Sequence, residues 1–228
     1  MPIPAQHRLA IYDMDKTITH APTWTSFLIR TARRQAPWRL VLLPFAAVAI
    51  GAYALKAIDR ARLKRITQGL LLGHRMRDTD ARRAADRFAD AVVASGVFAG
   101  ARAQIAADKA AGYQLVMATA SYRFYASAIA ERLGFDDVIG TEVEQVGDRL
   151  RARISGENCY GPAKLRMIQA WMAAHTIDRA DTAIRFYSDH VSDAPVLDWA
   201  DEPFAVNAHG PLRTLARDKG WPIVDWER

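Results

Sequence analysis

The stretch RLAIYDMDKTITH, residues 8–20, runs from an apolar segment directly into two aspartates, Asp13 and Asp15, which one residue separates. A short apolar run that ends in aspartate is typical of a buried parallel strand whose carboxyl end meets a polar site. Two carboxylates a few ångströms apart repel each other and resist burial unless a cation or a proton neutralises them. The stretch therefore predicts a strand over residues 9–12 and a site for chemistry at its end.

Strand and helix patterns alternate in the second half of the chain. Strands separated by helices imply a parallel sheet with right-handed crossovers, so the sequence predicts an α/β protein with a Rossmann-like parallel sheet core. The predicted strands cover residues 113–121, 137–139, 183–187 and 203–207, the predicted helices cover 98–111, 124–133 and 161–174, and a hairpin covers 142–154 with its turn at 147–148.

The first half of the chain has a different pattern. Between about residues 22 and 95 the apolar residues recur with helical periodicity, the composition is rich in Ala, Arg and Leu, and there is no strand signal. We therefore expect residues 1–20 and 97–228 to form an α/β catalytic core, and residues 21–96 to form an inserted all-helical cap domain. Residues 21–22 and 95–96 are the expected hinges.

Composition restricts the class of protein and its partners. Half of the 228 residues are hydrophobic and a quarter are charged, which is typical of a folded globular protein. The single cysteine, Cys159, excludes an internal disulfide, and no signal peptide pattern opens the sequence, so we expect a cytoplasmic protein. The net charge of +6 favours anionic partners. No basic and aromatic pattern of a nucleic-acid module occurs, so a nucleic-acid partner is not expected.

Polar residues follow the predicted strands where they end. In open parallel sheets the ligand site lies at the carboxyl ends of the strands, so these residues are expected to meet. Three carboxylates around one point suit Mg²⁺, and a lysine with a hydroxyl beside it would hold phosphate oxygens. The residues collected in this way are Asp13, Asp15, Thr119, Asp189 and Asp193, together with Lys164 at a predicted helix start.

Four short motifs occur in a fixed order: DMDKT, VMATAS, GPAK and YSDHVSD. They resemble the four ordered motifs of the haloacid dehalogenase superfamily of phosphohydrolases. The helical block between the first two motifs is similar to the cap of the subclass that includes phosphoserine phosphatases. The resemblance implies a magnesium-dependent phosphomonoester hydrolase with this superfamily's fold.

The resemblance also implies roles for individual residues. Asp13 would attack phosphorus and become an aspartyl phosphate, and Asp15 would protonate the leaving group and then activate water. The Mg²⁺ ligands would be Asp13, Asp15 through its backbone carbonyl, and Asp189. The substrate phosphate would be bound by Thr119, Ala120 and Lys164, with Thr17 and Asp193 in supporting roles. His190 stands where relatives carry a small residue, and both a site-wall role and a catalytic role remain open for it.

An apolar run of 16 residues, 40–55, lies inside the predicted cap between two basic segments. A membrane span usually needs about 20 apolar residues, so the run favours either a helix seated in an anionic lipid interface or a buried cap helix. The run also resembles the corresponding region of bacterial phosphatidylglycerophosphatases of the same subclass. This makes a lipid phosphate, such as phosphatidylglycerophosphate, the expected substrate, and an anionic membrane surface a candidate partner.

Two other functions remain open. A soluble small-molecule phosphatase, acting on phosphoserine or a similar metabolite, differs only in what the cap selects. Its phosphoserine form is disfavoured by the second motif, which has Thr119, Ala120 and Ser121 where phosphoserine phosphatases typically carry Ser-Gly-Gly. A non-catalytic anion- or membrane-binding module is disfavoured by the complete set of aspartates and lysine.

Overall fold

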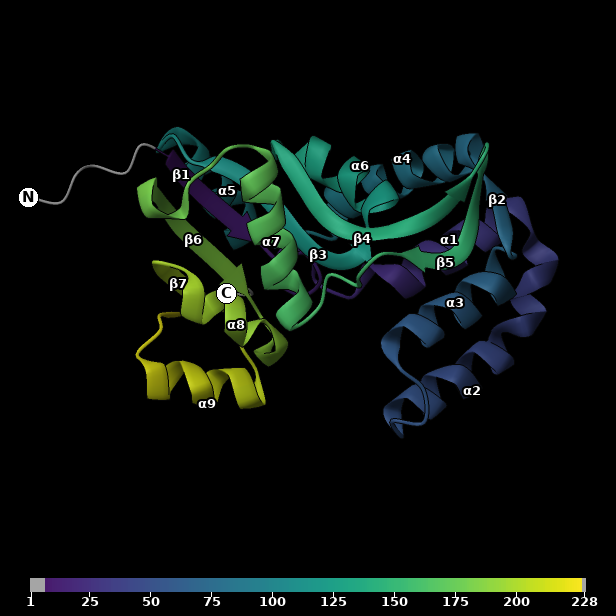
Figure 1. Ribbon diagram of the computed structural model, residues 1–228. Helices are drawn as coiled ribbons and strands as arrows, with labels where there is room; N and C mark the ends of the chain where they lie inside the picture. Colours follow the sequence, from purple (N-terminus) through teal and green to yellow (C-terminus); the bar gives the residue numbers. More distant parts are fainter. Residues whose placement is uncertain (1–6, 227–228) are drawn as a thin grey trace, which may run out of the picture.

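The computed structural model describes residues 7–226. In this part of the chain eight strands form one sheet in the order β2-β5-β4-β3-β1-β6-β7-β8 (Figure 1). The pairs from β4 to β8 are parallel, and only β4–β5 and β5–β2 are antiparallel. The predicted α/β fold is therefore confirmed. The strands are β1 (His7–Tyr12), β2 (Arg75–Arg77), β3 (Gln114–Tyr122), β4 (Asp137–Val146), β5 (Arg149–Ser155), β6 (Thr182–Ser188), β7 (Glu202–Val206) and β8 (Ile223–Val224).

The central strand β1 is buried on both faces because helices cover the sheet on both sides. Its side chains alternate between two hydrophobic cores: Ala10 and Tyr12 pack into one, and Leu9 and Ile11 into the other. The α-helices are α1 (Thr23–Gln35), α2 (Leu43–Ala54), α3 (Arg60–Leu71), α4 (Asp78–Ser95), α5 (Ala99–Ala110), α6 (Arg123–Leu133), α7 (Pro162–Ala174), α8 (Ala194–Trp199) and α9 (Gly210–Lys219). Short 3₁₀ helices are η1 (Pro37–Leu42), η2 (Arg179–Asp181) and η3 (Val191–Asp193).

The helical block between β1 and α5 leaves and re-enters the sheet domain at neighbouring points. Thr19 forms an isolated antiparallel bridge with Val97, and the His20 amide donates to the Gly96 carbonyl at 2.9 Å. Helix α4 packs closely on α6 of the sheet domain, and α3 packs on β5, whereas α2 lies on the far side of α3 at one end of the molecule (Figure 1). The block is thus anchored on one side and extends on the other.

One strand lies inside the block that the sequence predicts to be all-helical. Strand β2 pairs antiparallel with β5 through Arg75–Arg151 and Arg77–Arg149. Only Met76 of its three residues is buried. A segment of three residues is too short for an alternating apolar pattern to be recognised in the sequence. Its pairing depends on a hairpin more than 70 residues later in the sequence.

The predicted hairpin over residues 142–154 is present, and Gly147 has the left-handed φ of +59° that the turn requires. The separate strand predicted at 137–139 is instead the first part of β4, which continues without a break to Val146. The strand therefore pairs in parallel with β3 and, further along, antiparallel with β5. The hairpin is an extension of the main sheet.

The apolar run at residues 40–55 is exposed, so burial within the helical block does not explain it. In η1 and α2 only Ala46 and Ala49 are buried. Leu40 and Leu43 pack against the small core around Leu71, but other large side chains face outward, with exposed fractions of 71% for Val41, 64% for Phe45 and 71% for Val48. The segment Pro37–Ala54, of 18 residues, meets the length and composition of a membrane span.

Candidate active site

The carboxyl ends of the strands meet around one pocket of about 200 Å³. Asp13 and Asp15 follow β1, Ala120 lies near the end of β3, and Asp189 follows β6. The remaining lining residues are Lys16, Pro22, Arg60, Tyr160, Lys164, His190, Ser192 and Asp193. Of the residues predicted for the site, only Thr17 and Thr119 do not line the pocket.

Lys164 lies at the centre of the charged cluster, in the first turn of α7. Its ammonium group is 2.8 Å from Asp13 Oδ1 and 2.5 Å from Asp193 Oδ2, and the side chain is only 2% exposed. Burial opposes the positive charge, but the carboxylates of Asp13 and Asp193 outweigh it and raise the pKa of Lys164. The lysine is therefore held as a cation against the residue expected to be the nucleophile.

The pKa of Asp13 is raised to about 7. Burial is the largest cause, and the carboxylates of Asp193 and Asp189 add to it, while Lys164 acts in the opposite direction. Burial also raises the pKa of Asp189. The pocket is lined by four aspartates but only three cationic side chains, Lys16, Arg60 and Lys164, so its excess of negative charge favours a bound cation.

Thr17 joins the ends of β1 and β6. Its hydroxyl oxygen is 3.3 Å from Asp13 Oδ2 and 3.3 Å from Asp189 Oδ1, and it accepts a hydrogen bond of 3.0 Å from the Asp189 amide. The side chain is fully buried. Although Thr17 does not line the pocket, it fixes the distance between the two aspartates.

Asp15 is held by the first residue of α1. The Thr23 amide and the Thr23 hydroxyl each donate to Asp15 Oδ1 at 2.7 Å, and the Ser121 hydroxyl donates to Oδ2 at 2.9 Å. Thr23 in turn lies 3.1 Å from the Tyr125 hydroxyl. The orientation of Asp15 therefore depends on the helical block as well as on the sheet.

Thr119 is buried, and its hydroxyl accepts a hydrogen bond of 3.1 Å from the Ser121 amide instead of facing the pocket. The neighbouring Ala120 reaches the pocket wall. Its carbonyl accepts hydrogen bonds from Lys64 of α3 and, at 2.8 Å, from the Thr141 hydroxyl. The end of β3 is thus held in place by both the helical block and the sheet.

The donor set fits a magnesium ion. Asp193 Oδ1 is buried and has no hydrogen-bond partner among the described residues, so the pocket retains acceptor capacity that the protein leaves unused. Residues 7–226 contain no closed cluster of three or more His, Cys, Asp or Glu side chains around a metal position. Mg²⁺ does not need one, because it keeps several waters and binds through one or two carboxylates plus phosphate oxygens.

A carboxylate outside the pocket holds the two strands that carry the aspartates. Asp108 of α5 is fully buried, and its Oδ2 accepts hydrogen bonds from the hydroxyls of Tyr12 at 2.6 Å and Tyr187 at 2.9 Å. Its Oδ1 accepts from Arg185 at 2.7 Å. Tyr12 directly precedes Asp13, so this network positions the end of β1.

Sequence reasoning missed several residues of the pocket wall. Arg60 of α3 lies over the Tyr160 ring, with its guanidinium carbon 4.5 Å from the ring centroid. The two residues are 100 positions apart, and no local motif signals the contact. His190, by contrast, is singled out by the sequence for a site-wall or a catalytic role: it lines the pocket, and it accepts a hydrogen bond of 3.1 Å from the Ser192 amide, which is an N-capping arrangement at η3.

The class of protein is defined by its fold and by the position of its site. It is an α/β protein with a helical insertion, and its aspartates and lysine line a pocket at the carboxyl ends of the parallel strands. The chain belongs to the haloacid dehalogenase-like hydrolase family, whose model matches residues 10–198. The predicted superfamily is therefore confirmed.

Two curated relatives match part of the chain. It is 31% identical over 138 residues to the phosphoserine phosphatase SerB1 of Mycobacterium tuberculosis, which covers 60% of this chain and 44% of that protein. It is 28% identical over 123 residues to a histidinol-phosphatase of Neisseria meningitidis, with coverage of 51% and 54%. The chain thus spans less than half of SerB1.

Solved structures match almost the whole chain. A protein of unknown function from Bordetella pertussis Tohama I superposes with a TM-score of 0.86 and 26% identity, covering 96% of this chain and 99% of that one. A phosphoserine phosphatase in the form of a phospho-aspartyl intermediate analogue superposes with a TM-score of 0.61 and 17% identity, covering 97% and 94%. At this identity the second match describes the fold alone.

Proposed function

We propose that the protein is a magnesium-dependent phosphomonoester hydrolase that works through an aspartyl phosphate on Asp13, and that its substrate is a lipid phosphate such as phosphatidylglycerophosphate. The observation that carries the catalytic part is Lys164, buried between Asp13 and Asp193 at the carboxyl edge of the sheet. A buried cation beside two carboxylates can hold transferring phosphoryl oxygens near the attacking group.

The chemistry needs two steps. A carboxylate oxygen of Asp13 forms a bond to phosphorus while the ester P–O bond breaks, and Asp15 gives its proton to the leaving oxygen. Asp15 then takes a proton from water, the water oxygen attacks phosphorus, and inorganic phosphate leaves with Asp13 restored. The hydrogen bonds from Thr23 and Ser121 hold the Asp15 carboxylate for both transfers.

Residues of the chain bind the phosphoryl group and the metal. Lys164 contacts the phosphoryl oxygens and limits their repulsion from Asp13, and Ala120 lies on the pocket wall beside them. Mg²⁺ would be held by Asp13, Asp189 and the Asp15 backbone carbonyl, and when bound it would neutralise charge on the phosphoryl oxygens. Thr17 keeps Asp13 and Asp189 in register for this purpose.

The lipid part of the proposal rests on an exposed apolar stripe. Val41, Phe45 and Val48 are spaced by four and three residues along η1 and α2, so they lie on one face, and Leu55, which follows α2 directly, is 83% exposed. A helix that is apolar on all sides is stable when it is buried in protein or in lipid. Here protein covers only the side that packs on α3.

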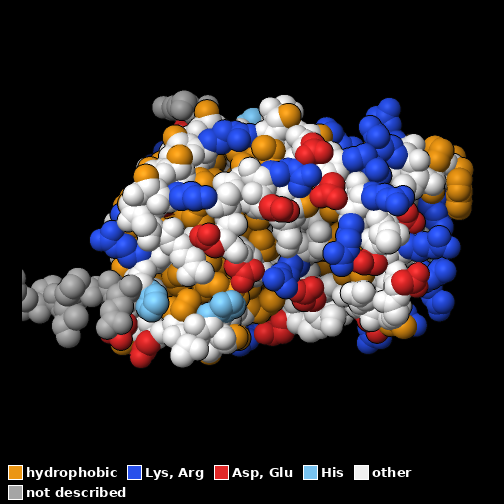
Figure 2. Space-filling model, turned by 90° about the horizontal axis from the view of Figure 1, so that it is seen from above, with side chains coloured by type: hydrophobic (Ala, Val, Ile, Leu, Met, Phe, Trp, Pro, Cys, Tyr) orange, Lys and Arg blue, Asp and Glu red, His pale blue; other side chains and the backbone are white. Residues whose placement is uncertain are grey.

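Positive charge surrounds this stripe. Arg34 and Arg39 precede the stripe in the sequence and Lys56 follows it, and Figure 2 shows Lys and Arg side chains gathered at the right-hand end of the molecule beside an exposed hydrophobic patch. An apolar helix face with basic surroundings suits the cytoplasmic surface of an anionic membrane. Helix α3 connects the two functions because it packs on α2 and carries Arg60 at the pocket wall.

Residues 21–96 would then act as a cap whose hinges lie at 21–22 and 95–96. The neighbouring bonds of His20 with Gly96 and of Ile18 with Phe98 support these positions, because the two ends of the block are tied together there. Opening of this cap would separate α3 from β5 and break the bond between Lys64 and the Ala120 carbonyl.

A soluble small-molecule phosphatase is the second candidate. It is favoured by the curated relatives, which are named as a phosphoserine phosphatase and a histidinol-phosphatase. It would keep the same catalytic residues and use the pocket wall, including Arg60 and Tyr160, to select a small substrate. The exposed stripe on α2 has no role in this alternative.

The experiment compares magnesium-dependent phosphate release from liposome-borne phosphatidylglycerophosphate, soluble phosphoserine and histidinol phosphate. We expect the liposome substrate to be preferred and Asp13→Asn to abolish release. Preference for a soluble ester would retain the mechanism and refute the lipid assignment, and no release from any ester would refute the hydrolase itself.

A paired variant separates docking from chemistry. Phe45→Asp with Val48→Asp is expected to reduce liposome binding at least tenfold and to leave release from a soluble ester within twofold of wild type. The matched control is Val146→Asp, which alters an exposed apolar residue in β4 at a distance from α2. If the α2 pair causes loss of a self-associated form of the protein instead of loss of liposome binding, the stripe is a contact between copies of the chain.

A further inference from the structure

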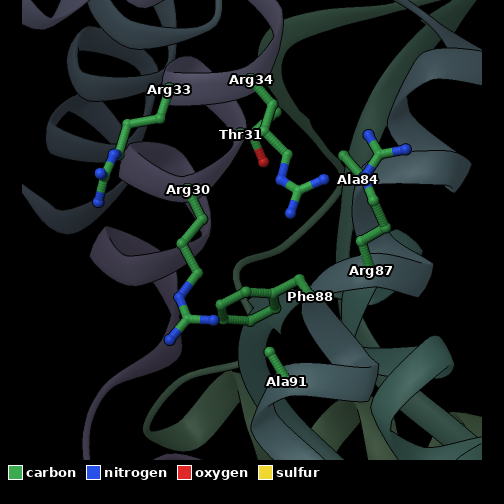
Figure 3. Close-up of a pocket in the computed structure, with 8 residues that line it drawn as sticks. All are labelled: Arg30, Thr31, Arg33, Arg34, Ala84, Arg87, Phe88 and Ala91. Atoms are coloured by element: carbon green, nitrogen blue, oxygen red, sulfur yellow. The ribbon is translucent and has the colours of Figure 1, made fainter.

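A second hollow, larger than the catalytic pocket, lies between α1 and α4 and has a volume of about 520 Å³. Its lining residues are Arg30, Thr31, Arg33, Arg34, Ala84, Arg87, Phe88 and Ala91 (Figure 3), and none of them lines the catalytic pocket. Four of the eight are arginines, and none is acidic. The hollow therefore concentrates positive charge in one place on the helical block.

The arginines come from both walls of the hollow. Arg33 and Arg34 lie three and four residues after Arg30 along α1, and Arg87 comes from α4. Figure 3 shows Arg34 and Arg87 extending into the gap from opposite sides and Arg30 reaching down towards Phe88, while Arg33 lies at the outer edge. This arrangement offers several planar donors to one ligand.

These guanidinium groups have no protein partner. Within residues 7–226 none of the four makes an ion pair or a side-chain hydrogen bond. None of the four aspartates of α4 pairs with them: Asp86 and Asp90 bind Arg132 of α6, Asp78 binds Arg82, and Asp80 makes no ion pair within the described part of the chain. Like charges that are held together without counter-charges repel each other, so an anion in the hollow would remove a cost that the fold otherwise carries.

The charge imbalance is confined to the helical block. Residues 21–96 contain 14 Lys and Arg but only 5 Asp and Glu, a net charge of +9, whereas the whole chain carries +6. The sheet domain is therefore not basic. An excess of arginine over lysine at one hollow favours bidentate binding of phosphate oxygens.

We propose that the hollow between α1 and α4 is a second anion-binding site, which takes a phosphate-bearing ligand through Arg30, Arg34 and Arg87. The base of the site is formed by Thr31 and Phe88, which are buried. Such a ligand can come from a soluble phosphorylated molecule or from a phospholipid head group. The site does not depend on the catalytic activity proposed for the other pocket.

The experiment uses the full chain with isotope-labelled arginine and follows the guanidinium Nε–Hε signals by NMR while inorganic pyrophosphate is added without magnesium at constant ionic strength. We expect saturable shifts of the Arg30, Arg34 and Arg87 signals. The Arg60 signal reports any binding in the catalytic pocket separately. Shifts that rise linearly with pyrophosphate, without saturation, would overturn the proposal.

A charge-matched pair of variants provides the control. Arg34→Gln with Arg87→Gln is expected to weaken pyrophosphate binding at least tenfold. Arg213→Gln with Arg217→Gln removes the same charge from the exposed arginines of α9 and is expected to change binding by less than twofold. Equal weakening by both pairs would show general electrostatic attraction and would refute a site.

The source of the ligand is distinguished by a second titration with vesicles of phosphatidylglycerol and phosphatidylcholine, against vesicles of phosphatidylcholine alone. Saturation of the same three signals at a lower phosphate concentration with the anionic vesicles identifies a lipid head group. Saturation at a lower concentration with pyrophosphate identifies a soluble ligand. Both results uphold the site. If the three signals saturate in neither titration, the site is rejected.

Discussion

Replacing Asp108 by Asn is expected to destabilise the protein strongly, although the residue is remote from the pocket. The carboxylate is fully buried and accepts hydrogen bonds from the Tyr12 hydroxyl at 2.6 Å, the Tyr187 hydroxyl at 2.9 Å and Arg185 at 2.7 Å. Asparagine keeps the shape but presents one acceptor oxygen instead of two and carries no charge. Some of these three donors then lose their partner.

The size of the effect follows from these contacts. Removing one partner of a buried ion pair costs about 3–5 kcal/mol. Arg185 is 24% exposed and keeps its bond to Glu202, so the lower end of that range applies. For a domain of this length about 1 kcal/mol corresponds to about 2–4 °C in Tm, so a loss of about 3 kcal/mol predicts a decrease of about 6–12 °C.

Thermal unfolding followed by circular dichroism measures this decrease. The matched control is Asp198→Asn, because Asp198 pairs with Lys219 and both side chains are about half exposed. Such a surface pair contributes about 0–1 kcal/mol, so its loss is expected to change Tm only slightly. A Tm for Asp108→Asn within about 2 °C of wild type would refute the assigned role of the network.

Three further outcomes are expected. Burial, with Arg60 adding to it, lowers the pKa of Lys64 from 10.5 to about 7, so between about pH 7 and pH 10 the unfolded chain binds more protons than the folded one and the free energy of unfolding rises with pH. Lys64→Met should flatten that rise when the free energy is measured by denaturant unfolding at several pH values. Equal slopes for the variant and the wild type would contradict this. A Cβ at Gly140 would lie 2.9 Å from Arg123 Cα, so Gly140→Ala should lower the free energy of unfolding by about 1–3 kcal/mol. A Cβ at Gly51 of α2 meets nothing within 4 Å, so Gly51→Ala should raise it by about 0.5–1 kcal/mol. Tm values that change in the same direction for both variants would disprove the contrast. Ser121→Ala removes a hydrogen bond to Asp15 and should lower kcat for phosphate release about tenfold with Tm nearly constant, while an unchanged kcat would show that Thr23 alone orients Asp15.

The parts of the site that could be predicted are those that local sequence determines. Asp13 and Asp189 directly follow apolar strands, and Lys164 comes two residues after the proline of a Gly-Pro helix start, so their meeting at one edge follows from a parallel sheet. Thr119 shows the limit of this reasoning, because a position next to the pocket does not determine which way a hydroxyl turns.

The parts that could not be predicted depend on contacts between distant segments. Strand β2, the Arg60–Tyr160 contact and the Lys64–Ala120 bond each join the helical block to the sheet domain, and single-sequence periodicity contains no term for such pairings. The exposure of α2 is another case, because an apolar composition is the same for a helix buried in protein and for one that faces outward.

The bond between Thr23 and Asp15 limits how the insertion can be exchanged. The two ends of the insertion meet at Thr19 and Val97, so a foreign domain could be joined there without disturbing the sheet. Asp15, however, takes two of its hydrogen bonds from the first helical residue of the insertion. A chimera would therefore need a serine or threonine at that helix start to keep both bonds, since a replacement helix without a hydroxyl would leave the carboxylate only the backbone amide at that position and its contact with Ser121.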